Sequence, residues 1–171
     1  MKKVMMTVLV AVLFTAAVAV GPAWSQGKAN FSLNLGVQTN VWGSIGAIGG
    51  SAFDNAWFTL DARVGFGLGK SLQISPELMY MVDDSFDLDS SILYPGVMLN
   101  YKPGNFFVGA GVVLPIAVGG GTVDSGNPAP KINIGYQYGK LIFTLYALTW
   151  TESGLDFLDM NFVGVTVGYR F

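Results

Sequence analysis

Five charged side chains lie inside segments that otherwise alternate between apolar residues and small or uncharged polar residues: Asp61, Arg63, Glu77, Lys131 and Arg170. Two of them, Asp61 and Glu77, are carboxylates, and a pair of carboxylates can act as general acid and base. The sequence supplies no histidine and no cysteine to complete such a site, which excludes thiolate nucleophiles, thiolate metal sites and disulfides. We therefore predict no catalytic residues, no cofactor and no metal site.

The remaining acidic residues gather in segments that we interpret as loops. The segment Asp83-Asp84-Ser85-Phe86-Asp87-Leu88-Asp89 is rich in carboxylates, which are preferred calcium ligands. It lacks the glycine and the final glutamate of an EF-hand loop, so we interpret it as a solvated acidic loop. The chain as a whole is slightly acidic, with 9 basic and 11 acidic residues, and has no basic cluster interleaved with aromatic residues. These features exclude a nucleic-acid partner.

The elements that must position the five charges have the two-residue period of β-strands, in which alternate side chains point to opposite faces. We predict eight strands, at residues 31–41, 58–68, 72–80, 93–102, 106–118, 131–138, 141–150 and 163–171. For the segment 141–150 the pattern does not indicate which face is which. After residue 25 the chain has no run of about 20 apolar residues, so it can span a membrane only as strands.

The connections between these strands alternate in length. Three links are tight, around Gly69-Lys70, Pro103-Gly104-Asn105 and Gly139-Lys140, whereas four are long, at about 43–55, 83–90, 119–129 and 151–157. Short turns at one end, long loops at the other and an even strand count are typical of bacterial outer-membrane barrels. We therefore predict an all-β fold, an eight-stranded antiparallel up-and-down transmembrane β-barrel.

A soluble lipocalin-like barrel is the alternative, because it differs only in pointing its apolar face inward. The polar face decides between the two. It contains asparagine, glutamine and serine together with seven glycines rather than the lysine, glutamate and threonine of a water-exposed face: Gly36, Gly65, Gly67, Gly96, Gly135, Gly164 and Gly168. An eight-stranded barrel has a lumen just wide enough for side chains, so small residues suit its interior. We predict that the polar face points inward and the apolar face contacts lipid.

The register of the second and third strands brings the charges together. Leu68 and Leu72 must both face lipid, so a turn over Gly69 to Ser71 pairs them and places Arg63 opposite Glu77. Asp61 then lies two residues from Arg63 on the same face. We predict an ion-pair network of Asp61, Arg63 and Glu77 that plugs the lumen, with Lys131 and Arg170 as further members. An ion path is the functional alternative.

The first 25 residues have the features of a secretory signal peptide. Lys2 and Lys3 precede an apolar run from Val4 to Val20, and the small residues Ala23 and Ser25 occupy the positions that a signal peptidase requires. We predict cleavage after Ser25, which leaves residues 26–171 as the barrel domain. A permanent membrane anchor is the alternative, although 17 residues are at the short limit for spanning a bilayer.

The last strand ends on an aromatic residue, and its alternate positions form one apolar stripe: Val163, Val165, Val167, Tyr169 and Phe171. With the strand count and the Tyr169-Arg170-Phe171 ending, the chain resembles the OmpA-like and OmpX-like eight-stranded outer-membrane barrels, without a periplasmic domain. The resemblance implies that this stripe is an assembly signal, read by the barrel-assembly machinery. It also implies a monomer in the outer membrane of a Gram-negative bacterium, in contact with lipid and lipopolysaccharide.

We predict a structural or surface-interaction role, carried by the four long loops rather than by catalysis. Two alternatives remain. A narrow channel for small or hydrophobic solutes, similar to OmpW-like barrels, is suggested by the bulky lumen candidates Met79, Met98 and Phe107. A lipid-modifying enzyme is disfavoured because outer-membrane enzymes of that kind rely on a histidine.

Overall fold

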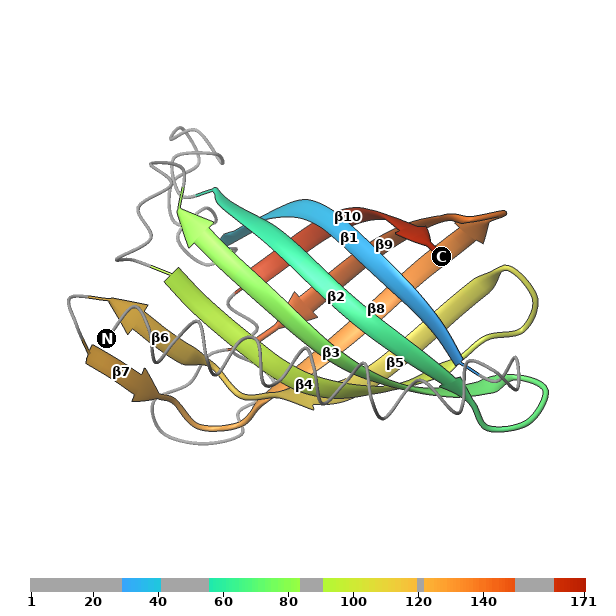
Figure 1. Cartoon of the computed structure of the whole chain (residues 1–171), viewed down its shortest axis with the longest axis horizontal. Coiled ribbons are helices and arrows are strands. Elements are labelled where there is room, and N and C mark those ends of the chain that lie inside the picture. The colour runs from blue at the N-terminus through green and yellow to red at the C-terminus, as the bar shows by residue number, and fades with distance from the viewer. Residues whose placement is uncertain (1–28, 41–55, 84–90, 120–121, 150–161) are drawn as a thin grey trace.

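The computed structural model describes residues 29–40, 56–83, 91–119, 122–149 and 162–171. The predicted signal peptide, residues 1–25, lies outside the described residues, as do most of the loops predicted at 43–55, 83–90 and 151–157. No helix in the described part of the chain is long and apolar enough to cross a membrane. The described residues form β-strands joined by short turns (Figure 1).

Eight strands close into an antiparallel barrel, in which each strand pairs with its neighbour in the chain and the first pairs with the last. They are β1 (Ala29–Asn40), β2 (Trp57–Gly67), β3 (Leu72–Asp83), β4 (Ser91–Tyr101), β5 (Phe106–Val113), β8 (Ala129–Tyr138), β9 (Leu141–Leu148) and β10 (Phe162–Arg170). The predicted count and order of strands are therefore confirmed.

The fifth predicted strand, 106–118, is interrupted. β5 ends at Val113, and the chain continues as β6 (Ile116–Gly119) after Leu114 and Pro115. Proline has no backbone N–H to donate to a ladder, which accounts for the break. β4 pairs with both pieces, so they act as one strand of the barrel wall.

The segment 119–129, predicted as a loop, is more ordered than expected. It contains β7 (Thr122–Ser125), which pairs with β6 in a hairpin that extends beyond the barrel wall (Figure 1). The sequence predicts a long connection here but no strand within it, because the side chains of the segment show no clear alternation and its pairing with β6 is made by the backbone.

Each of the three tight turns contains one glycine with a positive φ angle: Gly69 at 98°, Gly104 at 75° and Gly139 at 61°. Side chains other than glycine rarely adopt this backbone conformation, so these glycines allow the chain to reverse within a few residues. We call the end of the barrel that carries these turns the short-turn end, and the opposite end, from which the β6–β7 hairpin projects, the long-loop end.

The apolar face of the strands points outward, as predicted. On β1, Leu35 is 64% exposed whereas its neighbour Asn34 is fully buried, and on β10 Val165 and Val167 are about half exposed whereas Thr166 is buried. On β9, whose faces the sequence does not distinguish, Leu141, Phe143 and Leu145 point outward and Thr144, Tyr146 and Leu148 point inward. An apolar exterior around a polar interior is the arrangement of a barrel that spans a membrane.

Candidate functional site: the barrel lumen

The centre of the lumen holds the charged residues of β2 and β3. Arg63 pairs with Glu77 across the two strands, in the register predicted from the turn at Gly69. Asp61 precedes Arg63 by two residues on the same inward face. The guanidinium group of Arg63 therefore lies between the carboxylate of Asp61 and that of Glu77. The side chains of Asp61 and Glu77 are fully buried, and that of Arg63 is 10% exposed.

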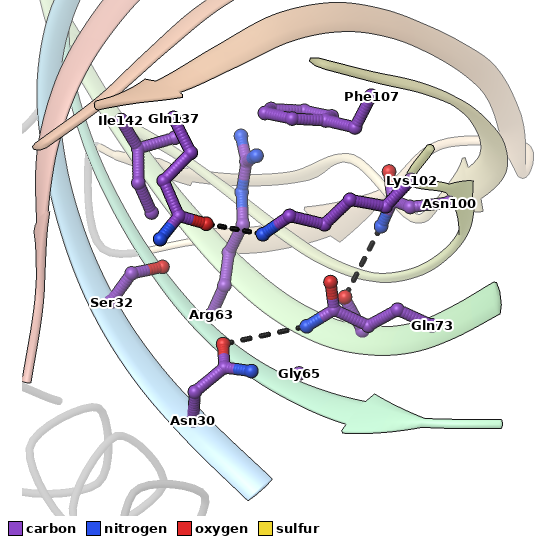
Figure 2. Close-up of a pocket in the computed structure, with 11 residues that line it drawn as sticks. Asn30, Ser32, Arg63, Gly65, Gln73, Asn100, Lys102, Phe107, Gln137 and Ile142 are labelled. Carbon is purple, nitrogen blue, oxygen red and sulfur yellow. Dashed lines mark hydrogen bonds between the residues drawn. The ribbon is translucent and has the colours of Figure 1, made fainter. Parts of the chain in front are cut away.

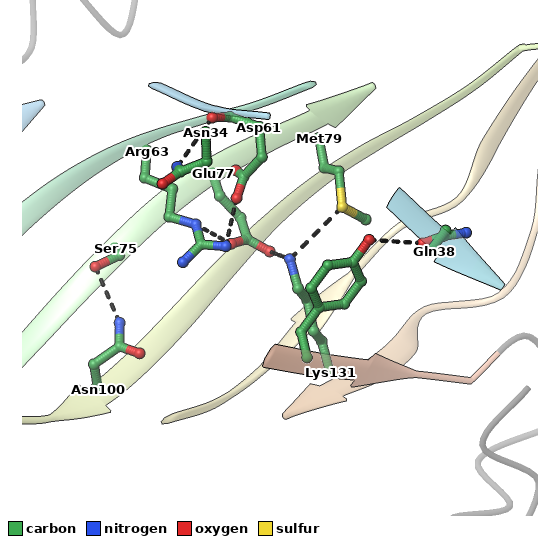
Figure 3. Close-up of polar contacts among 10 residues, drawn as sticks. Asn34, Gln38, Asp61, Arg63, Ser75, Glu77, Met79, Asn100 and Lys131 are labelled. Carbon is green, nitrogen blue, oxygen red and sulfur yellow. Dashed lines mark hydrogen bonds and ion pairs between the residues drawn. The ribbon is translucent and has the colours of Figure 1, made fainter. Parts of the chain in front are cut away.

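These residues form a connected set of ion pairs (Figure 3). The Nη2 atom of Arg63 contacts Oδ2 of Asp61, and its Nε atom lies 3.2 Å from Oε2 of Glu77. Lys131, on β8, reaches across the lumen and places its Nζ atom 2.7 Å from Oε1 of Glu77. Two acids and two bases from β2, β3 and β8 thus meet as a charge-neutral network, which we call the lumen network.

The charges of the lumen network are paired with one another, and each carboxylate is held by at least one cation. Burying a charge is favourable only when it is paired, and removal of one partner leaves the other desolvated and alone. The arrangement therefore joins opposite walls of the barrel and fills its centre.

Arg170, the fifth predicted member, does not join the lumen network. It lies at the end of β10, opposite Ser32, and its backbone N–H donates to the carbonyl of Lys140 in the β8–β9 turn. The ion pairs found among the described residues do not include it. Its positive charge acts instead on Lys102, whose pKa it lowers.

Tyr146 is a lumen residue that the sequence does not reveal, because it lies on β9, whose faces are both largely apolar. Its hydroxyl donates a 2.8 Å hydrogen bond to Oε1 of Gln38 on β1. The Nζ atom of Lys131 lies 4.9 Å from the centre of its ring, in a cation–π contact. Tyr146 therefore connects the lumen network to β1, and Asn34 adds a second link by donating to the backbone carbonyl of Asp61 at 3.1 Å.

The lumen between the network and the long-loop end is tightly filled and mainly apolar, with the buried polar residues Gln38, Thr59, Ser91 and Thr149 among its side chains. We call this region the apolar half. Its core consists of buried side chains from five strands: Met79, Met81, Ile92, Tyr94, Val113, Ala129, Tyr146 and Leu148. The three candidates for lining a channel, Met79, Met98 and Phe107, all point inward and are buried, and Met79 belongs to this core.

The lumen between the network and the short-turn end is polar and incompletely filled. This region, the polar half, contains a cavity of about 40 Å³ (Figure 2). Its lining comes from most of the barrel strands and consists of Asn30, Ser32, Arg63, Gly65, Gln73, Ser75, Asn100, Lys102, Phe107, Gln137 and Ile142. A polar cavity of this size can hold a few water molecules.

Side chains in the polar half are joined in pairs across the strands. Asn100 donates to the hydroxyl of Ser75 at 3.2 Å, and Gln73 donates to the side-chain carbonyl of Asn30 at 3.4 Å. The ammonium group of Lys102 contacts the side-chain carbonyl of Gln137. Burial lowers the pKa of Lys102, which follows the end of β4, and the positive charge of Arg170 lowers it further.

Glycines on the inward face make room for these side chains. A Cβ atom added at Gly164 would overlap the ring of Tyr146, and one at Gly135 would overlap Phe107. Close neighbours also surround Gly36, Gly65, Gly96 and Gly168. Gly67, the seventh glycine assigned to the crowded interior, is an exception, because nothing lies within 4 Å of its added Cβ at the short-turn end.

The stripe on the last strand, Val163, Val165, Val167, Tyr169 and Phe171, lies on the outer surface and not in the lumen. The ring of Phe171 packs at 5.2 Å from that of Tyr169 and at 5.6 Å from that of Phe31 on β1. The backbone N–H of Phe171 also donates to Phe31 at 3.0 Å. The final residue therefore completes the seam at which the last strand meets the first.

Comparison with known proteins gives a match in structure but not in sequence. No protein-family model matches the chain, and no curated protein matches it. A solved structure from work on the de novo design of transmembrane β-barrels has a TM-score of 0.52 at 11% sequence identity, covering 83% of this chain and 95% of the other. The chain is an eight-stranded transmembrane β-barrel. This is the architecture implied by the resemblance to OmpA-like and OmpX-like barrels.

Two structures of Ail, the attachment invasion locus protein of Yersinia pestis, are less similar. The structure in complex with the heparin analogue sucrose octasulfate has a TM-score of 0.44 at 13% identity, and the other has a TM-score of 0.39 at 14% identity. Both comparisons cover 84% of this chain and 97% of Ail. In the part of the chain that the structure describes, no group of three or more acidic residues is placed to hold a metal ion.

Proposed function

We propose that this chain is a non-enzymatic protein of the outer membrane of a Gram-negative bacterium, with a structural or surface-interaction role carried by its long loops. The observation that supports this proposal most directly is the closed lumen. The lumen network occupies its centre with side chains that are between 0 and 10% exposed, and the apolar half is packed above it. In the described part of the chain the lumen is filled and both central carboxylates are ion-paired, which favours action through the surfaces that the barrel presents.

The proposed location rests on the signal peptide predicted at residues 1–25 and on the apolar band around the barrel. In that membrane the exterior contacts lipid and lipopolysaccharide. We further propose that the outward stripe of β10, ending at Phe171, is read by the barrel-assembly machinery during insertion. Its exposure supports this role, because a partner reaches only side chains that point away from the lumen.

Replacement of the long loops tests the surface role. In one variant, residues 43–55, 84–90 and 151–157, which lie within the predicted long loops, are each replaced by a short Gly-Ser link, and cells that express it are compared with cells that express the parent chain. We expect the variant to remain in the outer-membrane fraction, with different gel mobility before and after boiling, and to lose the cell–cell or cell–surface adhesion conferred by the parent. Adhesion that is unaffected by the replacement contradicts the proposal.

The enzyme alternative has its own readout. Expression of a lipid-modifying barrel changes the phospholipid or lipid A profile of the host, whereas a non-enzymatic barrel leaves both unchanged. We expect identical lipid profiles with and without the parent chain. A new lipid species that disappears on Glu77→Gln substitution overturns the non-enzymatic assignment.

A further inference from the structure

Among the described residues, Lys102 and Arg170 at the short-turn end make no ion pair with an acidic side chain. The lumen network is neutral by itself, because Asp61 and Glu77 are balanced by Arg63 and Lys131. It therefore leaves no uncompensated negative charge that could balance Lys102, whose ammonium group lies in the polar half, or Arg170 at the end of β10. None of the described residues that line the cavity is acidic. The charged residues of its lining are Arg63 and Lys102.

The two unbalanced cations are close enough to act on each other. The charge of Arg170 lowers the pKa of Lys102, which is also partly desolvated by burial. Arg170 lies opposite Ser32 on the ladder between β1 and β10, and Ser32 lines the cavity. Opposing residues of an antiparallel pair share one face, so Arg170 is on the lumen side of the wall. Like charges in such a place repel each other unless an anion lies between them.

The cavity has the donors that an anion requires. Figure 2 shows the Lys102 side chain extending across the cavity toward Gln137, with the guanidinium group of Arg63 pointing into the same space. The ion pairs of Arg63 use Nε and Nη2, which leaves Nη1 outside them. Ammonium and guanidinium groups form the strongest hydrogen bonds to anions.

We propose that the cavity at the short-turn end binds one small inorganic anion of the size of chloride, held between Lys102 and Arg63 with Arg170 close by. The volume of about 40 Å³ has room for a few water-sized particles and therefore for a small anion. The bound anion offsets the unbalanced cations and ties the end of β4 to β2 and β8.

Thermal unfolding in two salts tests the site. The refolded full chain is heated in detergent in sodium chloride or sodium gluconate at equal ionic strength, and the unfolding midpoint is followed by gel mobility. We expect the midpoint to rise with chloride to a plateau, with no such rise in gluconate, whose anion is too large. Lys102→Met should abolish the chloride-dependent rise, whereas Lys70→Met, at an exposed lysine of the neighbouring turn, should retain it.

Two results overturn the proposal: equal midpoints in both salts, or a chloride-dependent rise that persists in Lys102→Met. A second measurement does not depend on folding of the variant. Crystals of the parent chain grown in sodium bromide should give an anomalous peak between Lys102 and Arg63. Well-ordered side chains around the cavity without a bromide peak contradict the proposal.

Discussion

The two halves of the lumen are filled by side chains of different kinds. The apolar half is packed with methionine, tyrosine, leucine and valine side chains and resembles the core of a soluble protein. The polar half holds asparagine, glutamine and serine side chains around a small cavity. The lumen network, where Glu77 contacts both Arg63 and Lys131, separates them.

The difference indicates where the barrel is closed and where it can take up water. Water in the polar half can replace a lost hydrogen-bond partner, so single polar groups there should contribute little to stability. In the apolar half an unpaired polar group has no such replacement and carries the full cost of desolvation. Equivalent substitutions in the two halves should therefore have different effects.

The largest effect is expected at the boundary. Arg63→Ala leaves Asp61 without its ion pair and Glu77 with Lys131 alone, so it should lower the free energy of unfolding by about 3–5 kcal/mol. Urea unfolding of the refolded barrel measures this loss, with Lys140→Met in an exposed turn as the control. An unfolding curve that matches that of the parent contradicts the structural role of the network.

Packing in the apolar half is tested at Gly164. Its added Cβ would overlap the buried ring of Tyr146, so Gly164→Ala should lower the free energy of unfolding by about 1–3 kcal/mol. Gly67→Ala is the matched control, because the same atom meets nothing within 4 Å there. Equal urea midpoints for the two variants would mean that the apolar half is looser than its packing indicates.

Two buried tyrosines of the apolar half differ in the hydrogen bonding of their hydroxyl groups. Tyr146→Phe removes the 2.8 Å hydrogen bond to Gln38 and leaves the buried Oε1 atom of Gln38 without this donor, so it should cost about 1–3 kcal/mol. Tyr94 is equally buried, but its hydroxyl makes no hydrogen bond to the described residues, so Tyr94→Phe should be neutral or slightly stabilising. The two unfolding midpoints measure the difference, and the reverse order would argue against this hydrogen-bond assignment.

The smallest effect is expected in the polar half. Ser75→Ala removes the acceptor of the Asn100 side chain, a loss similar in kind to that in Tyr146→Phe. Because water in the cavity can take its place, the cost should stay below about 0.5 kcal/mol. A cost as large as that of Tyr146→Phe, measured by the same urea titration, would remove the distinction between the two halves.

Much of this arrangement is encoded locally and could be predicted. The lipid-facing leucines at 68 and 72 fix the register of β2 and β3, and with it the pairing of Arg63 with Glu77. The lumen-facing side of β9 could not be predicted because the part of this strand near the long-loop end lines the apolar half. Its inward residues there, such as Tyr146 and Leu148, are as apolar as the outward ones. Alternation with a period of two identifies the lumen-facing side of a strand only where the lumen and the lipid differ in polarity.

Other features depend on contacts that alternation does not encode. Arg170 faces the lumen in the same ladder row as Arg63, since both lie opposite Ser32, but among the described residues it makes no ion pair. The β7 strand is stabilised by pairing with β6 rather than by its own residues. The break before β6 did have a signal in the sequence, since Pro115 interrupts the predicted strand 106–118.

Electrical recording from the refolded parent chain in planar lipid bilayers tests the central claim, a transmembrane barrel with a closed lumen, most directly. The lumen network and the apolar half leave no continuous path for ions, so the account predicts a baseline without conductance steps after insertion, with insertion verified by protease protection. Reproducible single-channel steps of the parent chain would contradict a closed lumen and favour the narrow-channel alternative.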